Sequence, residues 1–168
     1  MPSSEFLVGG SSIVHQATVT LTDTQIKALP TTAIQIVAAP GANTAIQFQY
    51  GVITLTPSAG AYTNLHADNY LNIALGAGLI EASGYVKGYP GDTTVFTGAA
   101  FPQAAAQGAG FFERSVIVNT FTLADVTNAA LSIWWSNSDG NLTGGNAANT
   151  LRVSVAYLLL NTSTGEFE

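Results

Sequence analysis

Apolar and polar residues alternate strictly along several short stretches of the chain, the pattern expected of a strand with one buried face. The clearest case is residues 15–22, where every second position is apolar and Thr18, Thr20 and Thr22 lie between. The same reasoning predicts further strands at 33–39, 46–55, 62–66, 70–75, 79–83, 93–97, 112–118, 130–136 and 150–160. In residues 70–75, Asn72 and Ala74 are expected to take the polar face.

Two strands have patterns of their own. In residues 46–55, Phe48 and Tyr50 share one parity while Ile53 takes the other, and Gly51 lies between them. A bulge at Gly51 would bring both apolar sets to one face. Residues 150–160 form the most apolar strand. Because such a strand would invite aggregation at a sheet edge, it is expected to be central or paired on both sides.

Helical signals are few and short. Thr22 and Gln25 fit a capping box, and Pro30 stops any continuation, so one or two helical turns are predicted over a sheet edge. Pro102 and Gly108 would permit one short helix in the Ala-rich segment 98–110, which is otherwise a loop.

Strands, turns and the lack of long amphipathic helical windows together predict the fold class. About eight to ten short strands indicate an all-β, single-domain β-sandwich or jelly roll. This domain is expected to span residues 15–168, with residues 136–146 as a polar hairpin connection. Residues 1–14 form an extended N-terminal arm, either a frayed end or a segment that docks Phe6, Leu7 and Val8 on a neighbour.

The low fraction of charged residues adds an expectation about assembly. Only 8% of the 168 residues are charged, against about 25% in a typical soluble domain. Large uncharged areas are seldom left to water, so the chain is expected to associate with itself. Four isolated cations and a net charge of −6 argue against direct nucleic-acid binding. No membrane span or secretory signal is evident, and a soluble chain made in the cytoplasm is expected.

No pattern of catalytic residues emerges. The chain has no cysteine, which excludes disulfides and thiolate chemistry. His15 and His66 are interpreted as surface or hydrogen-bonded histidines, and no nucleophile elbow accompanies them. Asp139 to Asn141, with Asn137 and Asn146, is the best calcium candidate but is better explained as a turn. We therefore expect no enzyme, cofactor or metal site.

Aromatic side chains are the remaining candidates for recognition. Trp134 and Trp135 are adjacent on a predicted strand, so they face opposite sides and one is expected to leave the core. Tyr85 and Tyr89 lie in a Gly- and Pro-rich loop. Packing in a core or interface is the commoner role of such rings, and a carbohydrate platform is the alternative. The interface candidates are Phe6, Leu7, Val8, Phe101, Trp134, Trp135, Tyr85 and Tyr89.

Four segments, residues 18–29, 32–41, 58–64 and 149–157, resemble in order and texture the head decoration or cement proteins of tailed bacteriophages. The chain departs from that family in segment 98–110 and in the loop 136–149. The resemblance implies a compact β-sandwich or jelly roll that trimerises and reinforces the lattice of the major capsid protein. The expected location is the capsid surface of the virion. The alternative is a receptor-binding or carbohydrate-binding module of a phage tail or fibre.

Overall fold

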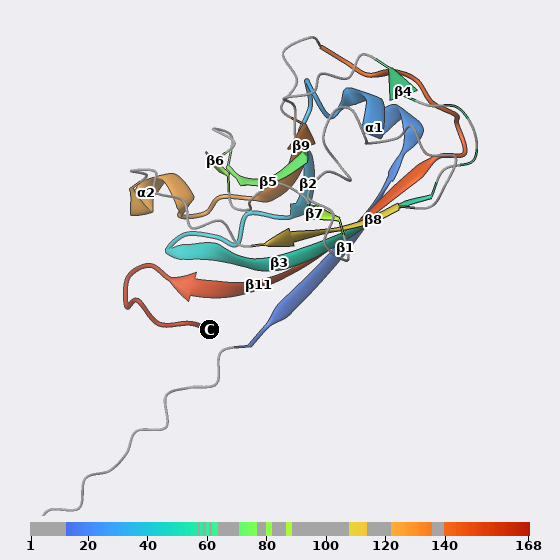
Figure 1. Cartoon of the computed structure of the whole chain (residues 1–168). Helices are drawn as coiled ribbons and strands as arrows, with labels where there is room; N and C mark the ends of the chain where they lie inside the picture. The colour runs from blue at the N-terminus through green and yellow to red at the C-terminus, as the bar shows by residue number, and fades with distance from the viewer. Residues whose placement is uncertain are drawn as a thin grey trace, which may run out of the picture.

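The protein is described here from a computed structural model, which covers residues 13–56, 58, 60, 62–63, 71–76, 80–81, 87–88, 108–113, 122–135 and 140–168. These residues form antiparallel strands in three sheets, with two short helices (Figure 1). The all-β class predicted from the alternating pattern is therefore confirmed. The predicted strand at 93–97 lies outside the described residues.

The largest sheet contains the strand that opens the described chain and the strand that nearly closes it. Its five strands, in spatial order, are β1 (His15–Thr22), β11 (Thr150–Asn161), β3 (Thr44–Thr56), β8 (Gly108–Glu113) and β7 (Lys87–Gly88). The very apolar β11 is paired on both sides, with β1 and with β3, as predicted. The short β7, from the Gly- and Pro-rich loop, takes an edge, where proline and glycine are tolerated.

The second sheet has four strands and the third has two. The four strands are, in spatial order, β2 (Ile34–Val37), β9 (Leu131–Trp135), β5 (Leu71–Leu75) and β6 (Ile80–Glu81). The small sheet pairs β10 (Thr143–Gly144) with β4 (Tyr62–Thr63). The helices are α1 (Asp23–Ala28) and α2 (Leu123–Val126).

One hydrophobic core joins the two larger sheets. Side chains of β3 and β11, such as Ile53 and Val153, belong to the same buried cluster as Ile133 and Trp135 of β9. Figure 1 shows the four-stranded sheet lying over the five-stranded one, with α1 at one end. Ile26 and Leu29, in and just after α1, are fully buried in this cluster. The helix therefore covers an end of the core.

The switch of face along β3 occurs as predicted, but slightly earlier than Gly51. The β3–β11 register shifts between Ala156 and Tyr157, which pair with Tyr50 and Phe48, so that Gln49 is the extra residue. Phe48 consequently points into the core while Tyr50 is 53% exposed. The glycine itself continues the regular register opposite Val155.

Both helices begin with reciprocal polar contacts. In α1 the backbone amide of Gln25 donates to Thr22 Oγ1, and the backbone amide of Thr22 donates to the side-chain Oε1 of Gln25. This confirms the predicted capping box. Sequence reasoning did not find α2, although the chain carries a related signal. There the Thr122 amide donates to Asp125 Oδ2 at 2.7 Å, with aspartate in place of glutamate or glutamine.

Three expectations need correction. Strand β5 is buried on both faces, including Asn72 and Ala74, so its polar residue does not meet solvent. Strand β8 begins at Gly108, inside the segment offered as a helix or loop, because it pairs with Leu55 of β3. The polar connection 136–146 contains β10, which pairs with β4.

Candidate functional site

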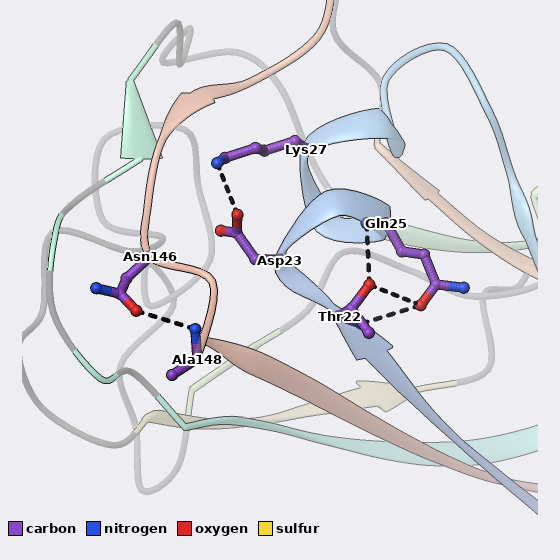
Figure 2. Close-up of polar contacts among 6 residues, drawn as sticks. All are labelled: Thr22, Asp23, Gln25, Lys27, Asn146 and Ala148. Carbon is purple, nitrogen blue, oxygen red and sulfur yellow. Dashed lines mark hydrogen bonds and ion pairs between the residues drawn. The ribbon is translucent and has the colours of Figure 1, made fainter.

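Three of the described ionisable side chains, Asp23, Lys27 and Tyr62, lie together beside α1. We call this the Asp23–Tyr62 cluster, and its members are Asp23, Lys27, Tyr62, Gly145 and Asn149. They come from α1, from β4 and from the connection that leads into β11. Figure 2 shows Asp23 and Lys27 on the helix, with the chain around Asn146 passing alongside.

The ion pair within the cluster joins adjacent turns of α1. Lys27 Nζ lies 2.6 Å from Asp23 Oδ2, and the aspartate is 7% exposed overall. The aspartate is in the first turn and the lysine in the last, so each also complements the helix dipole. The backbone carbonyl of Lys27 accepts a hydrogen bond of 3.0 Å from the amide of Leu142. Helix and connection are thereby tied together.

The second half of the cluster is a pair of buried oxygens. Asp23 Oδ1 and the Tyr62 hydroxyl are both buried and neither makes a hydrogen bond of good geometry. Burial raises the pKa of Tyr62 above its ordinary value, Asn149 lowers it somewhat, and the neighbouring Asp23 carboxylate raises it again. Tyr62 therefore keeps its proton and faces a carboxylate oxygen that can accept it in a hydrogen bond.

Two glycines allow the segments of this cluster to approach. Gly145 has φ +70°, and a Cβ there would lie 2.5 Å from both Asp23 Oδ1 and Tyr62 Cε1. A Cβ on Gly60, whose φ is +76°, would lie 2.9 Å from the Gly145 carbonyl oxygen. Asn149 is 1% exposed, and its Oδ1 accepts a 2.7 Å hydrogen bond from the amide of Ser58.

The arrangement is suited to holding α1, β4 and the connection before β11 together rather than to proton transfer. A tyrosine with a raised pKa is neither a base nor a nucleophile near neutral pH. Among the described residues, no group of three or more His, Asp or Glu side chains could hold a metal ion. Sequence reasoning missed this cluster. The spacing of Asp23 and Lys27 was visible, but Tyr62 and Asn149 meet them only through the tertiary fold.

The raised pKa of Tyr62 predicts an alkaline loss of stability. Because the folded state holds the protonated form, this contribution is complete below pH 10.0, the ordinary pKa of the phenol, and is lost as the pH rises above it. We expect the wild type to lose unfolding free energy from about pH 10 upward and Tyr62→Phe to lose less. Urea titrations across this range give the slope. Tyr50→Phe, at an exposed side chain, should follow the wild type, and equal slopes for all three proteins would contradict the expectation.

A shallow cavity of about 480 Å³ lies away from the Asp23–Tyr62 cluster. It is lined mainly by alanines, with polar groups from Asn128 and Ser132. Asn128 has φ +54°, and its Oδ1 accepts a 2.9 Å hydrogen bond from the amide of Gly41. The described lining carries no ionisable group, so it provides no side chain for acid–base catalysis.

The two adjacent tryptophans have opposite surroundings. Trp135 is fully buried and packs in the core between the sheets, so it is corrected from an interface candidate to a core residue. Trp134 lies on the other face of β9, opposite Asn72, and is half-buried. Its Nε1 is buried and has no hydrogen-bond partner. The other interface candidates, Phe6, Leu7, Val8, Phe101, Tyr85 and Tyr89, lie outside the described residues.

The remaining polar candidates have structural explanations where they are described. His15 stacks on Tyr157, with ring centroids 5.4 Å apart. Asn146 Oδ1 accepts a 2.9 Å hydrogen bond from the amide of Ala148, the contact that closes an Asx turn (Figure 2). Asn141 Oδ1 accepts from Thr31 Oγ1. His66, Asn137 and Asp139 lie outside the described residues.

Over β1, β11 and β3, the solvent side of the five-stranded sheet is a hydroxyl-rich surface, and this three-strand part is called the outer face. Thr18 Oγ1 and Ser154 Oγ are 2.9 Å apart across β1 and β11. Arg152 is the charged member, between Thr20 and Thr54 in the register. The outer face comprises Gln16, Thr18, Thr20, Thr22, Tyr50, Val52, Thr54, Thr56, Thr150, Arg152 and Ser154.

Comparisons of the chain with protein-family models, with curated proteins and with solved structures gave no match. Within the described part of the chain, neither helix is long and apolar enough to cross a membrane.

Proposed function

We propose that this protein is a structural protein of a virion, a capsid decoration or cement protein. It forms a homo-oligomer, most simply a trimer, which binds the lattice of the major capsid protein and acts by occupancy rather than catalysis. Its fold in this proposal is a β-sandwich, since two sheets contribute to one buried core. Binding a folded protein to the lattice stabilises the assembly by mass action.

The observation that carries the proposal is the outer face. It spans three long neighbouring strands and presents hydroxyl and amide groups with Arg152 as its charged member. Such a surface can make many neutral hydrogen bonds to a neighbour with little desolvation of charge. Repetition of such contacts by symmetry suits reinforcement of a shell.

The four segments that carry the phage resemblance support the same proposal. Residues 18–29 form most of β1 together with α1, residues 32–41 contain β2, and residues 149–157 begin β11. These three segments contribute strands to both of the larger sheets and the helix at the end of the core. Because the resemblance is carried by strands and a helix, it favours the architecture of the decoration proteins and implies no catalytic group.

Two measurements test the proposal. Mass spectrometry of purified particles should find the protein in virions, in a fixed ratio to the major capsid protein, and separated heads should retain it. Light scattering over a dilution series should give an oligomer at micromolar concentration. A protein absent from virions would remove the decoration role, and a stable monomer would remove the oligomer.

The alternative is a carbohydrate-binding module of a tail or fibre, favoured by Trp134. This ring is the half-buried tryptophan on the face of β9 away from the core. A glycan array decides between the two roles, because the alternative requires binding that Trp134→Ala abolishes. If no glycan is bound, or if the variant binds as well as the wild type, the alternative is excluded.

A further inference from the structure

Strand β1 is the outer strand of its sheet, and the described residues pair it only with β11. Its register runs over all eight residues without a bulge. Proteins usually protect such an edge with lysine, proline, a bulge or an inward charge. Residues 13–22 contain none of these devices. Among the described residues, β2 lies near β1 but no strand pairs with the free side of β1, so its backbone groups are left for another strand.

The described core side chains become more exposed along this edge. Val153 and Val155 of β11 are 0% and 3% exposed, whereas their partners on β1, Val19 and Ala17, are half-buried. Both β1 side chains pack against the core cluster from its margin. One more strand bearing apolar side chains on the core side would cover them. The free backbone side of β1 together with Ala17 and Val19 is called the β1 edge below.

The chain before β1 leaves the sheet, and the C-terminal residues explain why. Continuing the register would place Val14 opposite Leu158 and Ile13 opposite Leu159. That side of β11 is already used, because Glu168 donates its amide to the Leu159 carbonyl and Phe167 bridges Leu160. Ile13 and Val14 are consequently 59% and 53% exposed. Two large apolar side chains just before β1 are thus left without a place in the sheet.

The arm has the length and the side chains that the β1 edge requires. Twelve residues precede Ile13, and they can extend over about 40 Å, whereas an eight-residue strand measures about 26 Å. Phe6 and Val8 alternate with Leu7, so a strand there presents two apolar side chains to one face. A hairpin of the arm onto its own β1 would leave residues 9–14 as the connecting loop, and the cysteine experiment below distinguishes that pairing from pairing between two copies.

We propose that the β1 edge receives the N-terminal arm of a second copy of this chain. Residues 5–8 of that copy add a strand beside β1 and place Phe6 and Val8 over Ala17 and Val19. The contact joins different surfaces of the two copies, so it can close as a reciprocal dimer or as a ring, and a ring of three accords with the proposed trimer. This inference rests on the oligomeric part of the proposed function and does not depend on where the protein is located.

Cysteine pairing tests the contact directly, because the chain has no cysteine of its own. With Phe6 and Val8 over the two β1 side chains, Leu7 lies opposite Thr18. Purified Leu7→Cys and Thr18→Cys proteins are mixed, allowed to exchange subunits and mildly oxidised. We expect the mixed disulfide to form on the order of tenfold faster than with Val52→Cys as the partner of Leu7→Cys. Val52 is level with Thr18 in the ladder but two strands from the edge.

Deletion of residues 1–12 gives a second readout, because these residues lie before the described fold. The truncated chain should keep the far-ultraviolet circular dichroism of the wild type and dissociate at a higher concentration in light scattering.

A disulfide that forms only in a doubly substituted single chain would assign the arm to its own β1 and overturn the proposal. Equal rates of mixed-disulfide formation by Leu7→Cys with Thr18→Cys and with Val52→Cys would also overturn the proposal. An oligomer unchanged by the deletion refutes the arm contact alone, whereas a wild-type monomer refutes the oligomer as well.

Discussion

Trp135→Ala is expected to cost about 3 to 5 kcal/mol of unfolding free energy, the range for truncating a large aromatic side chain in a core. Trp135 is fully buried and stands opposite Leu71 in the four-stranded sheet. Its backbone amide donates to the carbonyl of Leu29, immediately after α1. Loss of the ring would therefore open a void where β9, β5 and the helical end of the core meet. Urea unfolding at matched protein concentration measures the change.

The neighbouring tryptophan is the matched control. Trp134 is half-buried on the opposite face of β9, so its removal takes less apolar surface out of a packed environment. We expect Trp134→Ala to cost well under half as much as Trp135→Ala. Equal losses for the two variants would show that the faces of β9 have been assigned wrongly.

Gly145→Ala is expected to destabilise the protein by on the order of 3 kcal/mol, through strain and overpacking together. The residue has φ +70°, and the added methyl would meet Asp23 Oδ1 and the Tyr62 ring, each at 2.5 Å. Neither neighbour is free to withdraw, because the aspartate is held by Lys27 and the tyrosine is buried. The Asp23–Tyr62 cluster would have to separate, and thermal and urea unfolding should both report the loss.

Gly140→Ala separates the two causes. Gly140 also has a positive φ, +84°, but a Cβ there would meet no atom within 4 Å. Its cost should be confined to backbone strain, about 1 kcal/mol. The difference between the variants measures the crowding at Gly145, and similar losses would mean that the cluster contributes little to stability.

Local patterns predicted the elements that depend on neighbouring residues. The alternation in residues 15–22 gave β1, and Thr22 with Gln25 gave the start of α1. The face switch in β3 was also predicted, because Phe48 and Ile53 cannot share a face without an extra residue. Errors arose where strand pairing outweighed the local composition, as at Gly108, which begins β8 because Leu55 of β3 lies beside it.

Long-range contacts could not be predicted in the same way. Tyr62 and Asn149 are distant in sequence, and nothing local indicates that they meet Asp23 beside Gly145. Asn72 looked like the polar side of an alternating strand, yet β5 is buried on both faces. Which of two adjacent tryptophans enters the core depends on the parity of β9 relative to the sheet beneath it, which the sequence leaves open.

The sequence by itself determined the all-β class, the capped first helix and the scarcity of charge, because strand periodicity, capping and composition are properties of neighbouring residues. The tertiary structure decided which faces are buried, how the Asp23–Tyr62 cluster assembles and why Ile13 and Val14 do not pair with β11. The last point depends on residues from opposite ends of the chain. The C-terminal residues occupy the side of β11 along which Val14 and Ile13 would otherwise continue. Competition for one strand edge is a property of the folded chain, since it requires all of the competing segments to be in place.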